Sequence, residues 1–204
     1  MIIGGDLMSN RVLAIDFETS NSNRSSACSI GIALLEDGEI TINKEILIDP
    51  EEHFSGFNIS IHGIRPEMVK GADTFPKVWE EVSKLIDDNT LIIAHNASFD
   101  MSVLRYVCDK YQMKYPTFDY ACTRVLGKKI YEELRSVSLD TIARYLDIDF
   151  EHHKAKDDAL VCLKVYNDIL SKSKYDNVDD LLNSIKIQKG KLFEDGYRPC
   201  GSKK

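Results

Sequence analysis

Cysteine is scarce in this sequence, and the few cysteines are not arranged to hold a metal or a disulfide framework. Five occur, an odd number, at wide spacings and never as a Cys-x-x-Cys pair. We therefore expect reduced thiols and a fold that needs no disulfides. The residues are Cys28, Cys108, Cys122, Cys162 and Cys200.

Long apolar runs are absent as well. No window approaches the run of about eighteen apolar residues that a membrane-spanning helix needs, so the sequence predicts no membrane partner. The first residues also lack the basic start and apolar stretch of a secretory signal. The sequence therefore favours a cytoplasmic protein.

An excess of basic residues is the third absence. Lysine and arginine number 26 against 33 aspartates and glutamates, a formal net charge of −7. This balance argues against a protein that coats long duplex DNA, because such binding neutralises many phosphates with lysine and arginine. It does not argue against an enzyme that grips a short strand end, since part of the negative charge can form a metal-binding site.

The length and composition indicate one globular domain with a substantial core. The chain has 204 residues, of which 43% are hydrophobic. We expect a loose lead-in at residues 1–10, a domain at 11–171, and a small helical extension with a tail at 172–204.

The hydrophobic patterns within residues 11–171 change along the chain. Three strands, at about 11–18, 28–35 and 39–48, predict an antiparallel meander, because Asp37-Gly38 is a turn signal. After a loop to Ile61, a short helix is expected from about Pro66. Helices then alternate with short strands, which predicts an α/β fold with a mixed sheet covered by helices on both faces.

The first strand ends in two carboxylates. Asp16 and Glu18 are two residues apart, so in a strand both point to the same side while Phe17 points to the other. Like charges this close oppose each other's ionisation unless cations lie between them. Oxygen ligands of this kind suit Mg²⁺ or Mn²⁺. The alternative is a strand that simply becomes polar where it enters a loop.

A further acid, Asp100, follows the buried strand at residues 91–94, in the first turn of the next helix. Sites in open α/β sheets collect at the carboxyl ends of strands, which makes Asp100 a candidate ligand. An aspartate at this position is also common simply because it interacts favourably with the helix dipole.

Another candidate segment is residues 152–159, where a loop enters a helix. Its spacing admits two registers, because His152 precedes Asp157 by five residues just as His153 precedes Asp158. The alanines fit the pattern His-x-Ala-x-x-Asp-Ala, which selects His153 and Asp158. In this register Asp157 is a solvated charge and His152 an incidental surface residue.

Three motifs together resemble the DnaQ-like (DEDDh) 3′→5′ exonucleases of the ribonuclease H-like superfamily. The resemblance extends over about residues 11–171, and Ile61-His-Gly-Ile64 is similar to a loop of proofreading members. It implies a ribonuclease H-like fold with a five-stranded mixed sheet. The motifs are Asp16-Phe-Glu18-Thr, Ala94-His-Asn96-Ala-Ser-Phe-Asp100 and His153-Lys-Ala-Lys-Asp-Asp158-Ala.

The resemblance also implies a catalytic apparatus. Two divalent metal ions, Mg²⁺ or Mn²⁺, clamp the attacking and leaving oxygens of a phosphodiester. His153 acts as general base, a role that suits histidine because its ordinary pKa is about 6.5. The matching metal ligands are Asp16, Glu18, Asp100 and Asp158.

The implied substrate is a single-stranded or frayed 3′ end, from which nucleoside 5′-monophosphates are released. We expect DNA, in a proofreading or repair role that requires a polymerase or another replication protein as partner. RNA is the alternative, and a non-catalytic nucleic-acid-binding subunit is a third reading that the complete set of acids disfavours. The expected nucleotide contacts are backbone groups of Phe17 and Thr19 and side chains of His62 and Asn96.

The chain departs from the family motif in the segment expected to contact the terminal nucleotide. The family commonly has Thr-Thr-Gly after the first glutamate, whereas this chain has Thr19-Ser20-Asn21. The approach of the backbone to the last nucleotide is therefore expected to differ.

Overall fold

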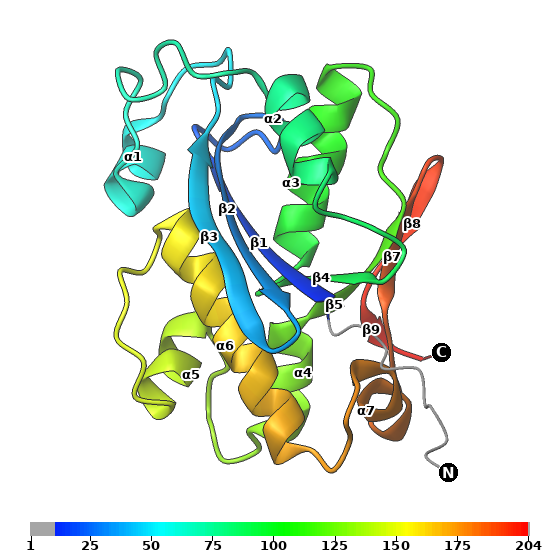
Figure 1. Cartoon of the computed structure of the whole chain (residues 1–204). Helices are drawn as coiled ribbons and strands as arrows, with labels where there is room; N and C mark the ends of the chain where they lie inside the picture. The colour runs from blue at the N-terminus through cyan, green and yellow to red at the C-terminus, as the bar shows by residue number, and fades with distance from the viewer. Residues whose placement is uncertain (1–10, 204) are drawn as a thin grey trace.

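The structure is a computed structural model that describes residues 11–203. A twisted sheet runs through the molecule with helices on both of its faces (Figure 1). The strands of this sheet are β1 Arg11–Thr19, β2 Ala27–Glu36, β3 Glu39–Leu47, β4 Thr90–Ala94, β5 Phe118–Cys122, β7 Gly190–Phe193 and β8 Gly196–Arg198. The helices are α1 Gly56–His62, α2 Phe75–Ser83, α3 Ser98–Lys110, α4 Thr123–Ile130, α5 Leu139–Tyr145, α6 Ala155–Lys172 and α7 Val178–Ser184.

The predicted mixed sheet is present, but with seven strands rather than five, in the order β3-β2-β1-β4-β5-β7-β8. β1, β2 and β3 form the expected antiparallel meander, and β1, β4 and β5 run parallel. The two additional strands are a hairpin on the β5 edge, with Leu192 fully buried. Glu194 and Asp195 form the turn of this hairpin, which lies within the segment expected to be a tail.

The C-terminal extension therefore differs from the prediction in its local structure. α7 lies where a small helix was expected, but residues 187–202 form strands, including β6 Ile187–Gln188 paired with β9 Gly201–Ser202. Leu181, Leu182 and Ile187 are buried in the same apolar cluster as α6. These side chains pack on the parent domain. The domain boundary expected near residue 171 stays a prediction, and the lead-in at 1–10 lies outside the described residues.

Each face of β1 packs against a different layer because side chains alternate along a strand. Leu13, Ile15 and Phe17 belong to an apolar cluster shared with α2 and α3. Val12 and Ala14 belong to a second cluster shared with α4, α5, α6 and α7. The next residues on this second face are Asp16 and Glu18, so the two carboxylates point toward the helices of the second layer.

A helix at residues 56–62 replaces the loop expected there, and the helix expected from Pro66 is a turn. The Ser55 hydroxyl accepts from Asn58 N and caps the start of α1, a contact that sequence patterns did not reveal. Gly63 ends the helix in a left-handed conformation, with φ of 77°. α1 therefore presents His62 to the end of β1.

Gly31 allows the close approach of β2 to the start of α6. A Cβ at this position would overlap the backbone carbonyl of Ala155. We expect Gly31→Ala to lower the free energy of unfolding by about 3 kcal/mol, because backbone cannot move aside as a flexible side chain can. Urea denaturation would measure the loss. Gly56→Ala is the matched control, since a Cβ there has no neighbour within 4 Å, and an equal loss in both variants would contradict the prediction.

None of the helices in the described part of the chain combines the length and apolar character that a membrane crossing requires. The five cysteines are free thiols, as expected, and four of them are buried.

Candidate active site

A pocket of about 630 Å³ lies at the carboxyl end of β1. Its walls come from the β1–β2 loop, α1, the start of α3, the start of α4, and the loop that leads into α6. The parallel strands β1, β4 and β5 all end at this edge of the sheet, so the segments that follow them converge here.

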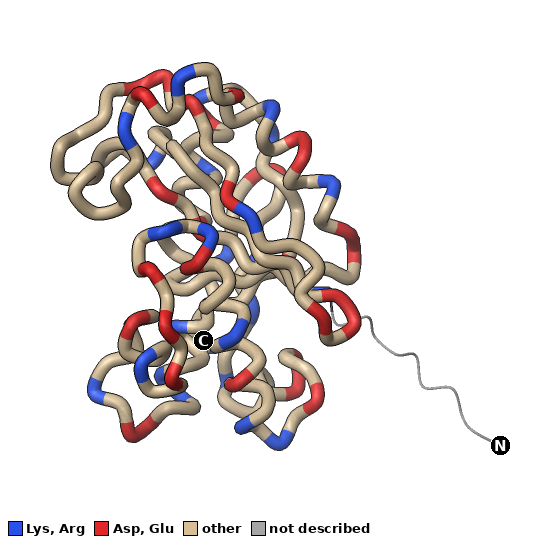
Figure 2. Tube along the Cα trace, turned by 60° about the vertical axis from the view of Figure 1, so that its left-hand side comes forward, with Lys and Arg blue, Asp and Glu red and all other residues tan. Residues whose placement is uncertain are grey.

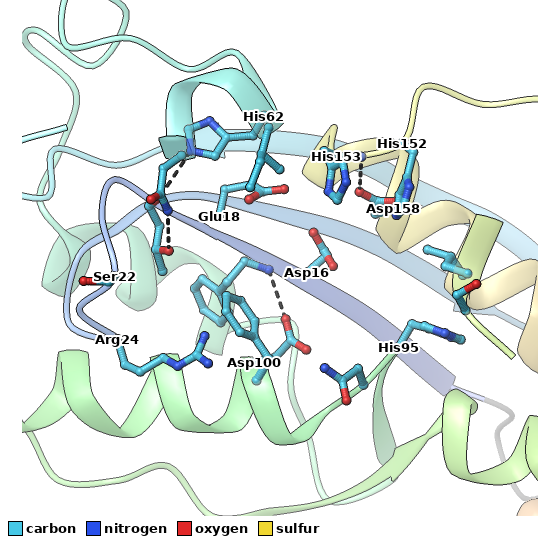
Figure 3. A pocket seen from close by; sticks show the side chains of 18 of the residues that line it. Asp16, Glu18, Ser22, Arg24, His62, His95, Asp100, His152, His153 and Asp158 are labelled. Atoms are coloured by element: carbon cyan, nitrogen blue, oxygen red, sulfur yellow. Dashed lines mark hydrogen bonds and ion pairs between the residues drawn. The ribbon is translucent and has the colours of Figure 1, made fainter. Parts of the chain in front are cut away.

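Three of the predicted acids meet inside this pocket. Carboxylate oxygens of Asp16, Glu18 and Asp158 lie within 4.8 Å of one another. Figure 3 shows these side chains turned toward each other from β1 and from the first turn of α6. Asp157, the alternative in the other register, is not among the residues that line the pocket.

Asp158 is nearly buried, with 3% of its surface exposed. Its Oδ2 accepts a hydrogen bond from the backbone N–H of His153 at 2.8 Å. Its Oδ1 is buried and has no hydrogen-bond partner among the described residues. Buried carboxylate oxygens are rarely left without a partner, so this atom indicates a missing ligand.

Asp100 lines the same pocket from the first turn of α3. Its Oδ1 accepts a hydrogen bond from the backbone N–H of Phe17 at 3.1 Å, which fixes the carboxylate against β1. Asp100 is therefore near the other three acids but outside their tightest group.

Burial raises the pKa of all four carboxyl groups. It is the largest cause at Asp16, whose pKa lies well above its usual range, and Asp100, Asp158 and Glu18 raise it further. Burial, with Asp158 and Asp100 next, raises the pKa of Glu18 to about 8. The pKa of Asp100 and that of Asp158 are each about 7, again mainly because of burial. A cluster of this kind is stable in its ionised form only with cations beside it.

His153 lies on the rim of the pocket beside Asp158. Its backbone is in the left-handed region, with φ of 66°, and its side chain is exposed. Burial, followed by the neighbouring His152 and His62, lowers its pKa below 6.5. The imidazole is therefore neutral at neutral pH and able to accept a proton.

His152 is not the incidental surface residue that was predicted. It lines the pocket, and its Nε2 lies 3.8 Å from Asp158 Oδ1. Its ring also stacks on that of His153, with centroids 4.0 Å apart. The spacing of the sequence admitted both histidines, and the fold brings both to the same carboxylate.

The predicted nucleotide contacts all line the pocket, but several of their polar groups already have partners. The N–H of Phe17 donates to Asp100, and the carbonyl of Thr19 accepts from the Asn58 amide at 2.8 Å. His62 is buried, with Nε2 at 3.1 Å from Thr19 O and Nδ1 accepting from a backbone N–H. Both nitrogens of His62 are thus occupied.

Asn96, the second residue after β4, has a left-handed backbone with φ of 67°. Its Oδ1 accepts a hydrogen bond from Arg124 Nη1 at 3.2 Å. The amide nitrogen of Asn96 makes no hydrogen bond to a described residue, so a donor remains for a ligand.

Several residues that line the pocket were not among the predicted site residues, and four of them are charged or aromatic side chains that could contact a nucleic acid. Arg124 is the second residue after β5, and the rule that sites gather at the ends of parallel strands would have indicated it. The others lie in a loop or on helix faces whose orientation the sequence does not reveal. They are Arg24, Phe57 and Phe99.

A ribonuclease H-like sheet that carries clustered carboxylates at the end of its first strand defines a nuclease of the phosphodiester-hydrolase class. Residues 13–166 match the family model described as RNase T exonuclease. The chain belongs to this family, within the DnaQ-like 3′→5′ exonucleases.

Proteins similar in sequence and structures similar in fold are consistent with this family assignment. A PolC-type DNA polymerase III of Thermotoga petrophila is 32% identical over 157 residues, which are 76% of this chain and 11% of the relative. The chain thus spans about a tenth of the length of the curated relatives it matches. Exonuclease X in complex with 5′ overhanging duplex DNA superposes with a TM-score of 0.67 at 21% identity, covering 80% of this chain and 93% of the other. The nuclease domain of 3′hExo, a DEDDh family member bound to rAMP, has a TM-score of 0.66 at 22% identity, covering 83% and 96%. These two structures share the fold.

Proposed function

We propose that this chain is a divalent-metal-dependent 3′→5′ exonuclease that releases nucleoside 5′-monophosphates from single-stranded or frayed ends. One observation carries the proposal. One carboxylate oxygen from each of Asp16, Glu18 and Asp158 lies within 4.8 Å of the others, and Asp158 Oδ1 is buried without a hydrogen-bond partner among the described residues.

The donor set fits the metals proposed. Carboxylate oxygens are hard ligands, which suit Mg²⁺ and Mn²⁺, and the raised pKa values indicate that the acids need cations to ionise together. Asp16, Glu18 and Asp158 would hold the ions, with Asp100 as the fourth ligand. Two bound divalent cations would neutralise the charge of the scissile phosphate and lower the pKa of an attacking water.

The chain's own residues supply the remaining steps. His153 accepts the proton from the attacking water, since its lowered pKa keeps the ring neutral. Its backbone N–H, bonded to Asp158, keeps the base next to the carboxylates. Thr19 and His62 mainly form a wall against which the terminal nucleotide packs, because their polar groups already have partners. Asn96 can donate hydrogen bonds from its side-chain amide to the nucleotide.

A single-stranded end fits the surroundings of the acids. Phe57 and Phe99 line the pocket, and Phe57 is 74% exposed, so an unpaired base has aromatic surface on which to stack. Figure 2 shows acidic and basic residues interspersed along the chain, which is the charge pattern expected when an enzyme contacts a short segment of strand.

We infer DNA as the substrate and a polymerase or another replication protein as the partner. The support is similarity to PolC-type DNA polymerase III and to a fold neighbour that was solved with duplex DNA. RNA is the second candidate, because another fold neighbour was solved with rAMP.

The test uses matched DNA and RNA oligonucleotides labelled at the 3′ or the 5′ end, each with Mg²⁺, Mn²⁺ or chelator. We expect 5′-labelled strands to shorten stepwise and 3′-labelled strands to release a labelled mononucleotide, in both cases only with metal. The ratio of rates on DNA and RNA decides the sugar preference. Binding without cleavage in all metal conditions would instead identify a non-catalytic subunit.

A further inference from the structure

The pocket has an uneven distribution of charge. Four carboxylates line it, whereas Arg24 and Arg124 are its only lysine or arginine residues among those that the structure describes. On the exonuclease function proposed above, on which this inference rests, each additional phosphate of the substrate brings negative charge toward these acids. The two guanidinium groups are therefore the side chains available to bind phosphates other than the scissile one.

Arg24 is already engaged with the pocket wall. Its guanidinium lies 4.1 Å from the centroid of the Phe99 ring, and the side chain is half-buried. Its charge also acts on Asp100, whose pKa it helps to lower against the larger effect of burial. Arg24 therefore belongs to the interior of the site.

Arg124 is held differently. It is exposed at the start of α4, and its Nη1 donates to the Asn96 side-chain oxygen at 3.2 Å. Within the described residues, Arg124 makes no ion pair with a carboxylate. An amide oxygen orients the guanidinium without cancelling its charge, and the other N–H donors remain for a ligand.

The two ends of the pocket are not equivalent. At the end next to Arg24, α1 is held to β1 by hydrogen bonds from Asn58 and His62 to Thr19, and to the β1–β2 loop by one from Ser55 N to Ser20 O. These segments form a wall on this side of the acids. This end is therefore suited to the terminal nucleotide.

The opposite end is marked by His95, which accepts from or donates to Thr123 Oγ1 at 2.9 Å. Figure 3 shows Arg24 and His95 on opposite sides of Asp16 and Asp100. Because Arg124 follows Thr123 directly and is exposed, it lies on the rim at the His95 end. If the terminal nucleotide lies at the Arg24 end, the rest of the strand would leave over this rim.

We propose that Arg124, oriented by Asn96, binds the phosphate that precedes the scissile one in a single-stranded substrate. Arg124 thus distinguishes a strand of at least three nucleotides from a mononucleotide ester. The interaction takes the form of a charge-assisted hydrogen bond at the open rim of the pocket.

The test compares two substrates. One is a short single-stranded oligonucleotide, and the other is the p-nitrophenyl ester of thymidine 5′-monophosphate, which has a scissile phosphate and no other. We expect Arg124→Ala to raise KM for the oligonucleotide about tenfold with kcat within about twofold, since a hydrogen bond to a charged group is lost. The kcat/KM for the ester should change by less than about twofold. Arg124→Lys should restore part of the oligonucleotide binding, because it keeps the charge.

A second test changes the substrate instead of the protein, by replacing the phosphate that precedes the scissile one with a neutral methylphosphonate. The wild type should lose about tenfold on this substrate, and Arg124→Ala should lose nothing further, because the two changes remove the same contact. Arg144→Ala is the control for a lost surface charge, as its side chain is 79% exposed and lies outside the pocket. If the losses from Arg124→Ala and from the methylphosphonate add up, or if Arg124→Ala loses equally on ester and oligonucleotide, the proposed role of Arg124 is wrong. Neither result would affect the exonuclease proposal. A wild type that cleaves neither substrate would remove the exonuclease proposal and this one with it.

Discussion

Asp158→Asn is expected to lower exonuclease turnover by about a thousandfold while leaving the fold intact. Losing roughly 4 kcal/mol of transition-state stabilisation corresponds to three decades in rate, and a metal-binding carboxylate contributes on this scale. Asparagine keeps the volume of the side chain and an acceptor for the His153 N–H. It also removes the negative charge of Asp158, which raises the pKa of both Asp16 and Glu18.

Thermal unfolding separates the loss of metal from a loss of structure. Without metal, we expect the melting temperature of Asp158→Asn to equal or exceed that of the wild type, because burial disfavours the ionised carboxyl. Addition of Mg²⁺ or Mn²⁺ should stabilise the wild type, since ligands that bind the native state raise its stability, and should hardly affect the variant.

The neighbouring Asp157→Asn is the matched control for this experiment. It removes the same charge from the same turn of α6 but from a side chain that does not line the pocket. It should keep both the activity and the metal-dependent stabilisation. A variant at Asp158 that retained both properties would exclude this carboxylate as a metal ligand.

The core of the site could be predicted because each step depends on local geometry. Two-residue alternation puts Asp16 and Glu18 on one face of β1 whatever surrounds the strand. The small residues at the start of α6 favoured Asp158 over Asp157, and the close contact between Gly31 and Ala155 gives a physical reason for this choice. The end of a buried parallel strand likewise indicated Asp100.

The edges of the fold could not be predicted in the same way. The strands β7 and β8 are short and pair with each other, and β7 joins the sheet through β5, which precedes it by about 70 residues in the chain, so only the tertiary fold gives this hairpin a partner. The residues that connect them, Glu194 and Asp195, do not form one of the dipeptides typical of tight hairpin turns. α1 was missed because it is short and its apolar side chains are largely exposed, leaving its caps as the main signal.

The pairing of His152 with His153 is the part of the site that sequence left open. Spacing alone admitted either histidine, and the stacked rings bring both close to Asp158. Two features favour His153 as the base. Its own backbone N–H donates a hydrogen bond to Asp158, and its lowered pKa keeps the ring able to accept a proton. The two histidines can be separated by substitution.

His153→Ala is expected to reduce kcat by about 10² to 10⁴-fold, the usual contribution of a general base, with metal binding retained. The metal-dependent rise in melting temperature should therefore persist, in contrast to Asp158→Asn. Because His153 has a positive φ, alanine adds backbone strain, so His153→Asn serves as a second variant that tolerates this conformation.

His152→Ala should lower kcat by less than about tenfold, since the hydrogen bond from His153 N to Asp158 does not depend on the neighbouring ring. The opposite order of losses would assign the base to His152, and wild-type turnover of His153→Ala at saturating Mg²⁺ would remove His153 from the mechanism.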